Sequence, residues 1–241
     1  MNYQLTYKEI RAKYGAKYGR ESVFIDVYVC LLSPIFTKIA VRHRLLPNTV
    51  TIGMILSGII GAFFFWMPYS ICKIVGIIFI HLWFILDCSD GEVARATKTF
   101  SKWGKELDYL AHTFNHPLFA MSFFISMYLD GYLLKGTILL FGLLILSDGI
   151  LRMIYVFHYI EVIKKGNEEN NSREKLKFGY KQLIILVINI FAQFPNFALI
   201  YPIVYIINAK AGYFYLIVNA FIATLYSLYA MIKWIGKIHR I

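Results

Sequence analysis

The feature that most constrains this chain is a succession of apolar segments, each long enough to cross a lipid bilayer as a helix. Hydrophobic residues make up 59% of the 241 residues, and the mean hydropathy is +0.58. Such segments must satisfy their backbone hydrogen bonds internally, which favours helices. We therefore expect an all-α polytopic membrane protein with six transmembrane helices, at roughly 48–67, 71–95, 101–129, 136–163, 180–208 and 211–235.

The stretch before these segments is basic and only imperfectly apolar. Residues 22–46 are interrupted by charged side chains and by Pro34. A seventh span here would place the basic N-terminal arm on the side of the membrane opposite the other basic loops. We therefore predict that residues 1–47 form a cytoplasmic or interfacial helical segment, bent at Pro34. Residues 48–241 are predicted to form the six-helix membrane domain.

The charge balance is strongly basic, with 25 Lys and Arg against 14 Asp and Glu and a formal net charge of +11. With six spans, all but four of these basic residues fall on one side. In a membrane protein such a surplus is typical of cytoplasmic loops beside anionic lipid, so lipids and not nucleic acids are the expected partners. We expect both termini and the turn after the second span to face the cytoplasm, at a bacterial or archaeal membrane. The four basic residues that do not fall on the cytoplasmic side are Lys73, Lys135, Lys210 and Arg152.

Two weaker patterns involve small residues and cysteines. Gly53, Ser57 and Gly61 recur every four positions in the first predicted span. Small residues at this spacing allow helices to approach closely, either within the chain or across a homodimer. The cysteines contain no CxxC pair and predict neither a disulfide framework nor a zinc site. They are Cys30, Cys72 and Cys88.

Ionisable residues concentrate where the second span ends and the third begins. Asp87 and Asp90 lie about 60° apart around one helix, and Gly104, Asp108 and His112 share one face of the next. A short turn makes the two helices antiparallel neighbours, so three carboxylates converge with an imidazole. Charged groups inside a membrane are costly and usually functional. We therefore interpret this cluster as the functional site.

Converging carboxylates repel one another unless a cation neutralises them. Oxygen ligands at this density suit Mg²⁺ or Mn²⁺, and one or two such ions would hold a pyrophosphate for displacement at phosphorus. Gly91 and Ala94 remove side-chain bulk on the same side of the helix. Arg95 offers a guanidinium to a phosphate.

The stretch 87–112 resembles the motif of the CDP-alcohol phosphotransferase family, D-x₂-D-G-x₂-A-R-x₈-G-x₃-D-x₃-D. Pro47-Asn48-Thr49-Val50-Thr51 is similar to the family's entry into its first span. The resemblance implies transfer of a phospho-alcohol group, such as phosphatidyl, from CDP-diacylglycerol or another CDP-alcohol to an acceptor alcohol, with release of CMP. It implies that Asp87, Asp90 and Asp108 bind metal. The expected contacts to the CDP-linked donor are Asn48, Thr51, Asp87, Gly91, Ala94, Arg95 and Gly104.

The last motif position departs from the family, because His112 stands where a fourth aspartate is expected. An imidazole can serve as a general base or bind a divalent ion, so we predict His112 and Asp108 as catalytic residues and His112 as a fourth metal ligand. The alternatives are that the protein is a catalytically impaired relative, or that His112 contacts substrate or is structural. His116 and Arg152 are candidate acceptor-binding residues. Arg152 also lies four residues after Asp148, a spacing that predicts an ion pair.

A second class of function also fits intramembrane carboxylates. In a transporter, the acidic cluster would be a cation or proton site. Transporters usually place such sites near the middle of the bilayer, between repeated halves. The cluster here lies at one edge of the predicted membrane domain and no internal repeat is visible, so the transferase is the favoured interpretation.

Overall fold

The computed structural model describes residues 5–15, 23–132, 136–164, 188 and 190–238. The described part is helical and contains no strand, which confirms the predicted all-α class. The N-terminal helices are α1 (Tyr7–Glu9), η1 (Ile10–Tyr14, a π-helical turn) and α2 (Val23–Arg42). The remaining helices are α3 (Pro47–Trp66), α4 (Ser70–Thr97), α5 (Gly104–Leu129), α6 (Thr137–Lys164), α8 (Phe194–Ile207) and α9 (Ala209–Ile238).

Four of the described helices are long and apolar enough to cross a membrane. They are α3, α4, residues Thr137–His158 of α6, and residues Ala209–Lys237 of α9. Helix α8 is apolar but shorter, and α5 has 26 residues whose first turns are polar. The count of six spans therefore stays a prediction. Part of the predicted fifth span, 180–208, lies outside the described residues.

Local signals set the boundaries of α3, α4 and α5, the helices around the acidic cluster. Helix α3 begins with a proline, a residue with no backbone N–H to leave unsatisfied in a first turn. Helix α4 is capped after Thr97 by Lys98, which adopts the left-handed conformation with φ 55° and donates its N–H to the carbonyl of Ala94. The chain then reverses direction and enters α5 at Gly104. Helix α3 packs against both α4 and α5.

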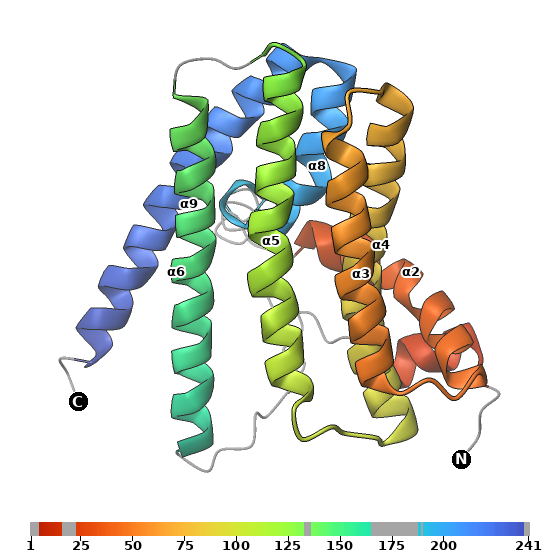
Figure 1. Ribbon diagram of the computed structural model, residues 1–241. Helices are drawn as coiled ribbons and strands as arrows, with labels where there is room; N and C mark the ends of the chain where they lie inside the picture. Colours follow the sequence, from red (N-terminus) through yellow and green to blue (C-terminus); the bar gives the residue numbers. More distant parts are fainter. Residues whose placement is uncertain (1–4, 16–22, 133–135, 165–187, 189, 239–241) are drawn as a thin grey trace.

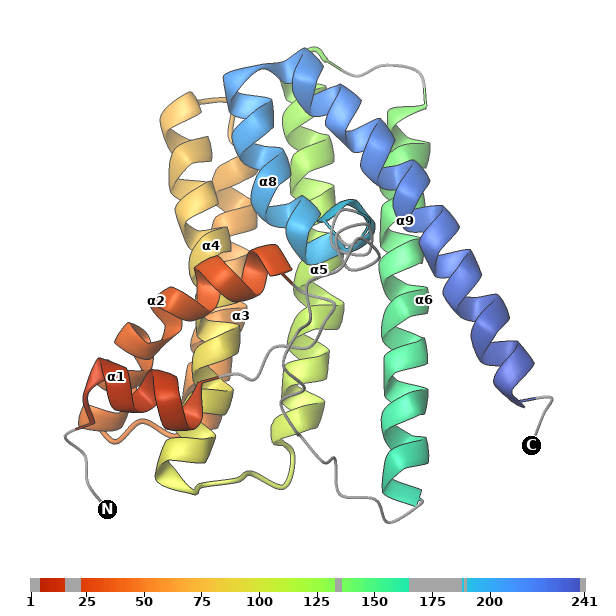
Figure 2. The same ribbon diagram turned by 180° about the vertical axis from the view of Figure 1, so that it is seen from behind.

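The helices form a bundle in which α3 lies between α4 and α5, and α6 packs against α9 (Figures 1 and 2). Close approach of α3 and α4 depends on glycines. A Cβ at Gly76 would lie 2.6 Å from the backbone nitrogen of Phe65, and one at Gly61 would lie 2.9 Å from Ile80. Packing within the chain thus accounts for Gly61. Gly53 has no neighbouring atom within 4 Å, and the homodimer stays untested.

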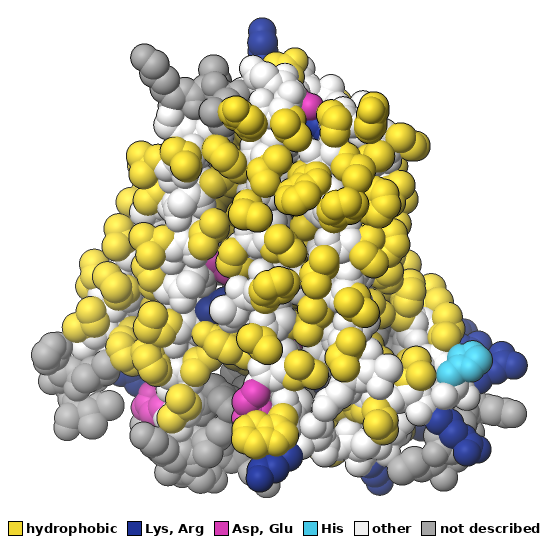
Figure 3. Space-filling view, in the orientation of Figure 1, with side chains coloured by type: hydrophobic (Ala, Val, Ile, Leu, Met, Phe, Trp, Pro, Cys, Tyr) yellow, Lys and Arg dark blue, Asp and Glu magenta, His cyan; other side chains and the backbone are white. Residues whose placement is uncertain are grey.

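The outer surface is largely apolar, as expected for a protein surrounded by lipid. Hydrophobic side chains cover the middle of the face in Figure 3, and most of its Lys and Arg side chains gather at the lower end. The turn between α4 and α5 and the ends of α6 and α9 also lie at this lower end (Figure 1). Large aromatic side chains fill the interior instead, among them Trp83, Phe119, Phe123, Phe197 and Tyr201.

The N-terminal segment packs on the lower part of the bundle, with α2 running obliquely across α4 (Figure 2). Helix α2 continues for 20 residues with Pro34 inside it. The helix is therefore not interrupted at Pro34, where we expected a bend. The hydroxyl of Tyr7 donates to the carbonyl of Leu31 at 2.9 Å and joins α1 to α2. At the start of α1, hydrogen bonds from the backbone N–H and hydroxyl of Thr6 lower the pKa of Glu9.

Candidate functional site

The predicted acidic cluster forms where α4 and α5 face each other near their connecting turn. Asp87 comes from α4, and Asp108 and His112 come from successive turns of α5. One ligand atom from each residue lies within 4.8 Å of the others. The spacing in the sequence predicted this meeting, because helical periodicity fixes which side chains share a face.

The three side chains are arranged around the Nε2 atom of His112. This nitrogen lies 2.9 Å from Oδ1 of Asp87 and 3.4 Å from Oδ1 of Asp108. The Asp108 oxygen is buried and makes no hydrogen bond within the described part of the chain. The indole of Trp83 packs against the imidazole edge to face, with ring centroids 4.8 Å apart, and limits how the His112 ring can turn.

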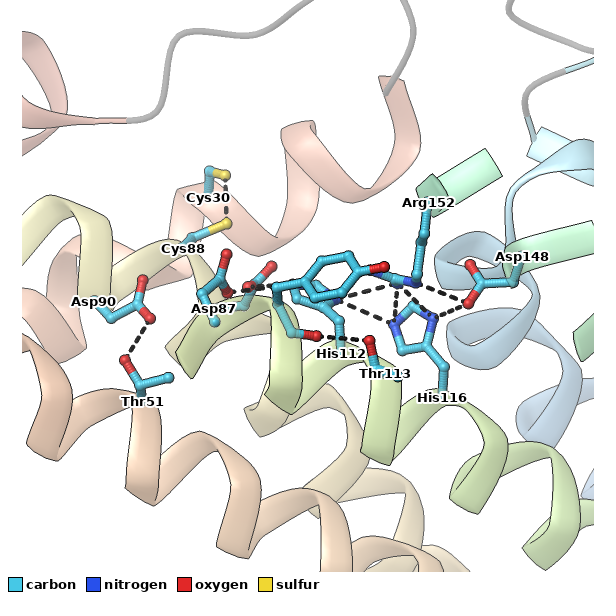
Figure 4. A network of polar contacts seen from close by, with 12 residues as sticks. Cys30, Thr51, Asp87, Cys88, Asp90, His112, Thr113, His116, Asp148 and Arg152 are labelled. Carbon is cyan, nitrogen blue, oxygen red and sulfur yellow. Dashed lines mark hydrogen bonds and ion pairs between the residues drawn. The ribbon is translucent and has the colours of Figure 1, made fainter. Parts of the chain in front are cut away.

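Asp90 faces α3, one turn further along α4. Its Oδ2 atom accepts a hydrogen bond from the hydroxyl of Thr51 at 2.8 Å (Figure 4). Near the start of α3, the side-chain amide of Asn48 donates to the hydroxyl of Ser101 at 3.0 Å. A Cβ at Gly104 would lie 3.8 Å from the side-chain oxygen Oδ1 of Asn48. The structure thus brings the predicted donor-binding positions of α3, α4 and α5 to one end of the bundle.

Arg95 lies one turn beyond Gly91 and directly follows Ala94, and its side chain is exposed. A Cβ at Gly91 would come within 3.1 Å of the Arg95 guanidinium, so the glycine leaves room for this group. The Nε atom of Arg95 donates to the backbone carbonyl of Tyr14 at 2.7 Å. The N-terminal arm therefore holds the side chain predicted to bind phosphate, a contact that no sequence pattern indicated.

A second set of polar side chains extends the site toward α6. Arg152 and Asp148 form the predicted ion pair, with Nε 2.9 Å from Oδ2, which confirms that expectation. The same Asp148 oxygen lies 3.0 Å from Nδ1 of His116. The Nη2 atom of Arg152 lies 3.2 Å from Nδ1 of His112 (Figure 4). A continuous chain of contacts therefore connects Asp148 on α6 with Asp87 on α4.

The donors in this chain determine where the imidazole hydrogens lie. A guanidinium has only donors, and an ionised carboxylate has only acceptors. Nδ1 of His116 therefore carries a hydrogen for Asp148, and the Nη2 hydrogens of Arg152 point to Nε2 of His116, at 3.1 Å, and Nδ1 of His112. Neutral His112 must then carry its hydrogen on Nε2 and donate it to Asp87. The 2.7 Å approach of Nη2 to Nδ1 of His116 joins two donors and is not a hydrogen bond.

The donor set fits a divalent cation of the Mg²⁺ or Mn²⁺ kind. Asp87 and Asp108 offer hard oxygen ligands at a common point, and the buried Oδ1 of Asp108 has no hydrogen-bond donor to satisfy it. Asp90, expected to converge with them, is not part of this group, and one of its oxygens is engaged by Thr51. His112 qualifies as a nitrogen ligand only when its Nε2 atom carries a lone pair, which requires Arg152 to release Nδ1.

Comparison with models of known protein families identifies a relationship. A family model described as CDP-alcohol phosphatidyltransferase matches residues 44–235. The match begins just before α3 and ends in α9, so it includes the acidic cluster and excludes α1, η1 and α2. No curated protein matches the chain.

Proposed function

This chain belongs to the CDP-alcohol phosphatidyltransferase family, and on that basis we propose that it transfers a phospho-alcohol group from a CDP-linked donor to an acceptor hydroxyl in a divalent-metal-dependent reaction. The donor is CDP-diacylglycerol or another CDP-alcohol, and CMP is released. The observation that carries this proposal is the convergence of Asp87, Asp108 and His112 at motif positions of two helices.

Asp87, Asp90 and Asp108 would hold Mg²⁺ or Mn²⁺. His112 would be a further ligand only in place of its role as a base, because one lone pair on Nε2 serves one of the two. Bound there, the ion would neutralise negative charge on the pyrophosphate and on the departing CMP. Arg95 would bind a phosphate of the donor through its forked donors. The donor would enter beside Asn48, Thr51 and Gly104, where Gly91 and Ala94 leave space for it next to α4.

In the proposed reaction, the acceptor oxygen forms a bond to the β-phosphorus while the bond from that phosphorus to the CMP oxygen breaks. The electron pair of the broken bond leaves with CMP, and the hydroxyl proton passes to a base. His112 is the proposed base, with Asp108 beside it. Because Nε2 of His112 must present a lone pair for this step, Arg152 has to move away from Nδ1 first.

The contacts of Arg152 favour an acceptor that carries an anionic group. A phosphate or carboxylate would attract the guanidinium, with His116 alongside as a neutral hydrogen-bonding partner. Withdrawal of Arg152 would leave Nδ1 of His112 free to take the hydrogen and Nε2 free to act. Binding of the acceptor would thus prepare the base, and a neutral alcohol would be a poor substrate.

The test is release of CMP by the purified full-length protein from radiolabelled CDP-diacylglycerol and soluble CDP-alcohols. Paired acceptors, with and without a phosphate, are supplied together with Mg²⁺ or Mn²⁺, and the lipid product is identified. Asp108→Ala should abolish release. Glu106→Gln, an exposed carboxylate on the same turn of α5, should leave it unchanged. Failure of every donor and acceptor pair to yield CMP would refute the transferase and favour the impaired or transporter alternatives.

A further inference from the structure

Two of the three cysteines meet at the interface between α2 and α4, beside the acidic cluster. The Sγ atoms of Cys30 and Cys88 lie 2.9 Å apart (Figure 4). Cys30 is fully buried, and Cys88 is partly buried in the position next to Asp87. Cys72 is on α4 as well, but 16 residues earlier, which places it about 24 Å away along the helix. The family match excludes Cys30 and says nothing about this pair.

Hydrogen bonds on the same interface fix the register of the two helices. The hydroxyls of Ser33 and Thr37 donate to the two carboxylate oxygens of Glu92, at 2.9 and 2.6 Å. The hydroxyl of Ser89 lies 3.1 Å from the carbonyl of Ser33. All four of these side chains are buried. Because these bonds lie within one to two turns of the thiols, sliding of α2 along α4 would break them, and the two sulfurs are held in contact.

We propose that Cys30 and Cys88 form a reversible disulfide on exposure to a small neutral peroxide, and that this bond lowers turnover. Hydrogen peroxide first converts Cys88, the more exposed thiol, to a sulfenic acid and one water. The sulfur of Cys30 then attacks the sulfenic sulfur, and a second water leaves as the S–S bond forms. In total, two thiols and one peroxide give one disulfide and two waters, and the sulfurs lose two electrons.

The effect on turnover follows from the distance that the sulfurs must move. A disulfide bond is about 2.05 Å long, so the sulfurs must approach by almost 1 Å. Cys88 shares a helical turn with Asp87 and Asp90, and displacements of about 1 Å at a reacting centre cost up to 100-fold in rate. We expect at least a tenfold fall in turnover. This part of the inference rests on the proposed function, whereas formation of the disulfide does not.

The experiment treats the purified full-length protein in liposomes with hydrogen peroxide, labels the remaining thiols with maleimide and maps the peptides by mass spectrometry. The parent and the Cys72→Ser control should lose two labelled thiols and give a Cys30–Cys88 cross-linked peptide. Cys30→Ser and Cys88→Ser should give no cross-link. CMP release should fall at least tenfold in the parent, recover with dithiothreitol, and resist peroxide in Cys30→Ser.

Three results would overturn the proposal. Unchanged labelling of both thiols, or oxidation of Cys88 to the sulfinic acid without a cross-link, would exclude the disulfide. A complete cross-link with unchanged CMP release would exclude the effect on turnover. Absence of CMP release from every untreated variant would instead refute the proposed function and the effect on turnover, while the thiol count still decides whether the disulfide forms.

Discussion

An ion pair at the end of the bundle opposite the acidic cluster gives the most quantitative test of the fold. Lys73, in the first turn of α4, pairs with Asp130, just after α5, and their side chains are 6% and 23% exposed. Asp130 also accepts a hydrogen bond from the hydroxyl of Tyr205 on α8 at 2.7 Å. One carboxylate therefore connects three helices, about 21 Å along α4 from Asp87.

Asp130→Asn keeps the shape and an acceptor for Tyr205 but leaves the Lys73 ammonium buried without a counter-charge. Removing one partner of a buried ion pair costs about 3–5 kcal/mol, and the partial exposure of Asp130 favours the lower end. A loss of about 3 kcal/mol corresponds to a fall in Tm of roughly 6–12 °C for a domain of this size. Thermal unfolding in detergent, followed by intrinsic fluorescence, measures this shift.

The double variant Lys73→Met with Asp130→Asn removes the charge together with its partner, so most of the lost Tm should return. Lys73 and Asp130 line a cavity of about 490 Å³, and Lys210 is an exposed lysine that lines it as well. Lys210→Met is therefore the matched control and should change stability by less than about 0.5 kcal/mol. CMP release per folded molecule should persist in all three. A Tm for Asp130→Asn equal to that of the parent, or a double variant as unstable as the single one, would refute the reasoning.

The remaining predictions concern the site. Asp148→Asn should keep the shape around Arg152 but weaken two charge-assisted hydrogen bonds, so kcat/KM measured by CMP release should fall about 10- to 100-fold. An effect on Tm alone would contradict a role of Asp148 in positioning Arg152 and His116. Arg152→Lys should raise the KM for an anionic acceptor about tenfold and leave the donor KM unchanged, because lysine lacks the forked donors. His112→Ala should reduce kcat at least about 100-fold, whereas His112→Asp should keep or improve it; full activity in the alanine variant would exclude a base. EDTA should abolish CMP release, and Mg²⁺ or Mn²⁺ should restore it; persistent release in EDTA would exclude a metal.

Much of the site follows from short-range periodicity in the sequence. Asp87 and Asp108 belong to adjacent helices joined by a short turn, so helix geometry and the motif spacing were enough to predict that they meet. Long apolar runs likewise determined the all-α membrane class, because a bilayer leaves the backbone few alternatives. The ion pair of Asp148 and Arg152 was also predictable, since residues four apart on a helix are neighbours.

Contacts between distant segments were decided only by the tertiary structure. The sequence does not state which face of α6 turns toward α5, yet that rotation brings Arg152 to His112 and assigns the imidazole hydrogen. It does not give the register of α2 on α4 either, which places Cys30 against Cys88. Periodicity acts within one helix, whereas packing between helices depends on the shapes and polar groups of every side chain at the interface. The sequence alone therefore determined the carboxylates and their contacts within a helix or across a short turn, and the packing of α2, α4, α5 and α6 decided the contacts between distant segments.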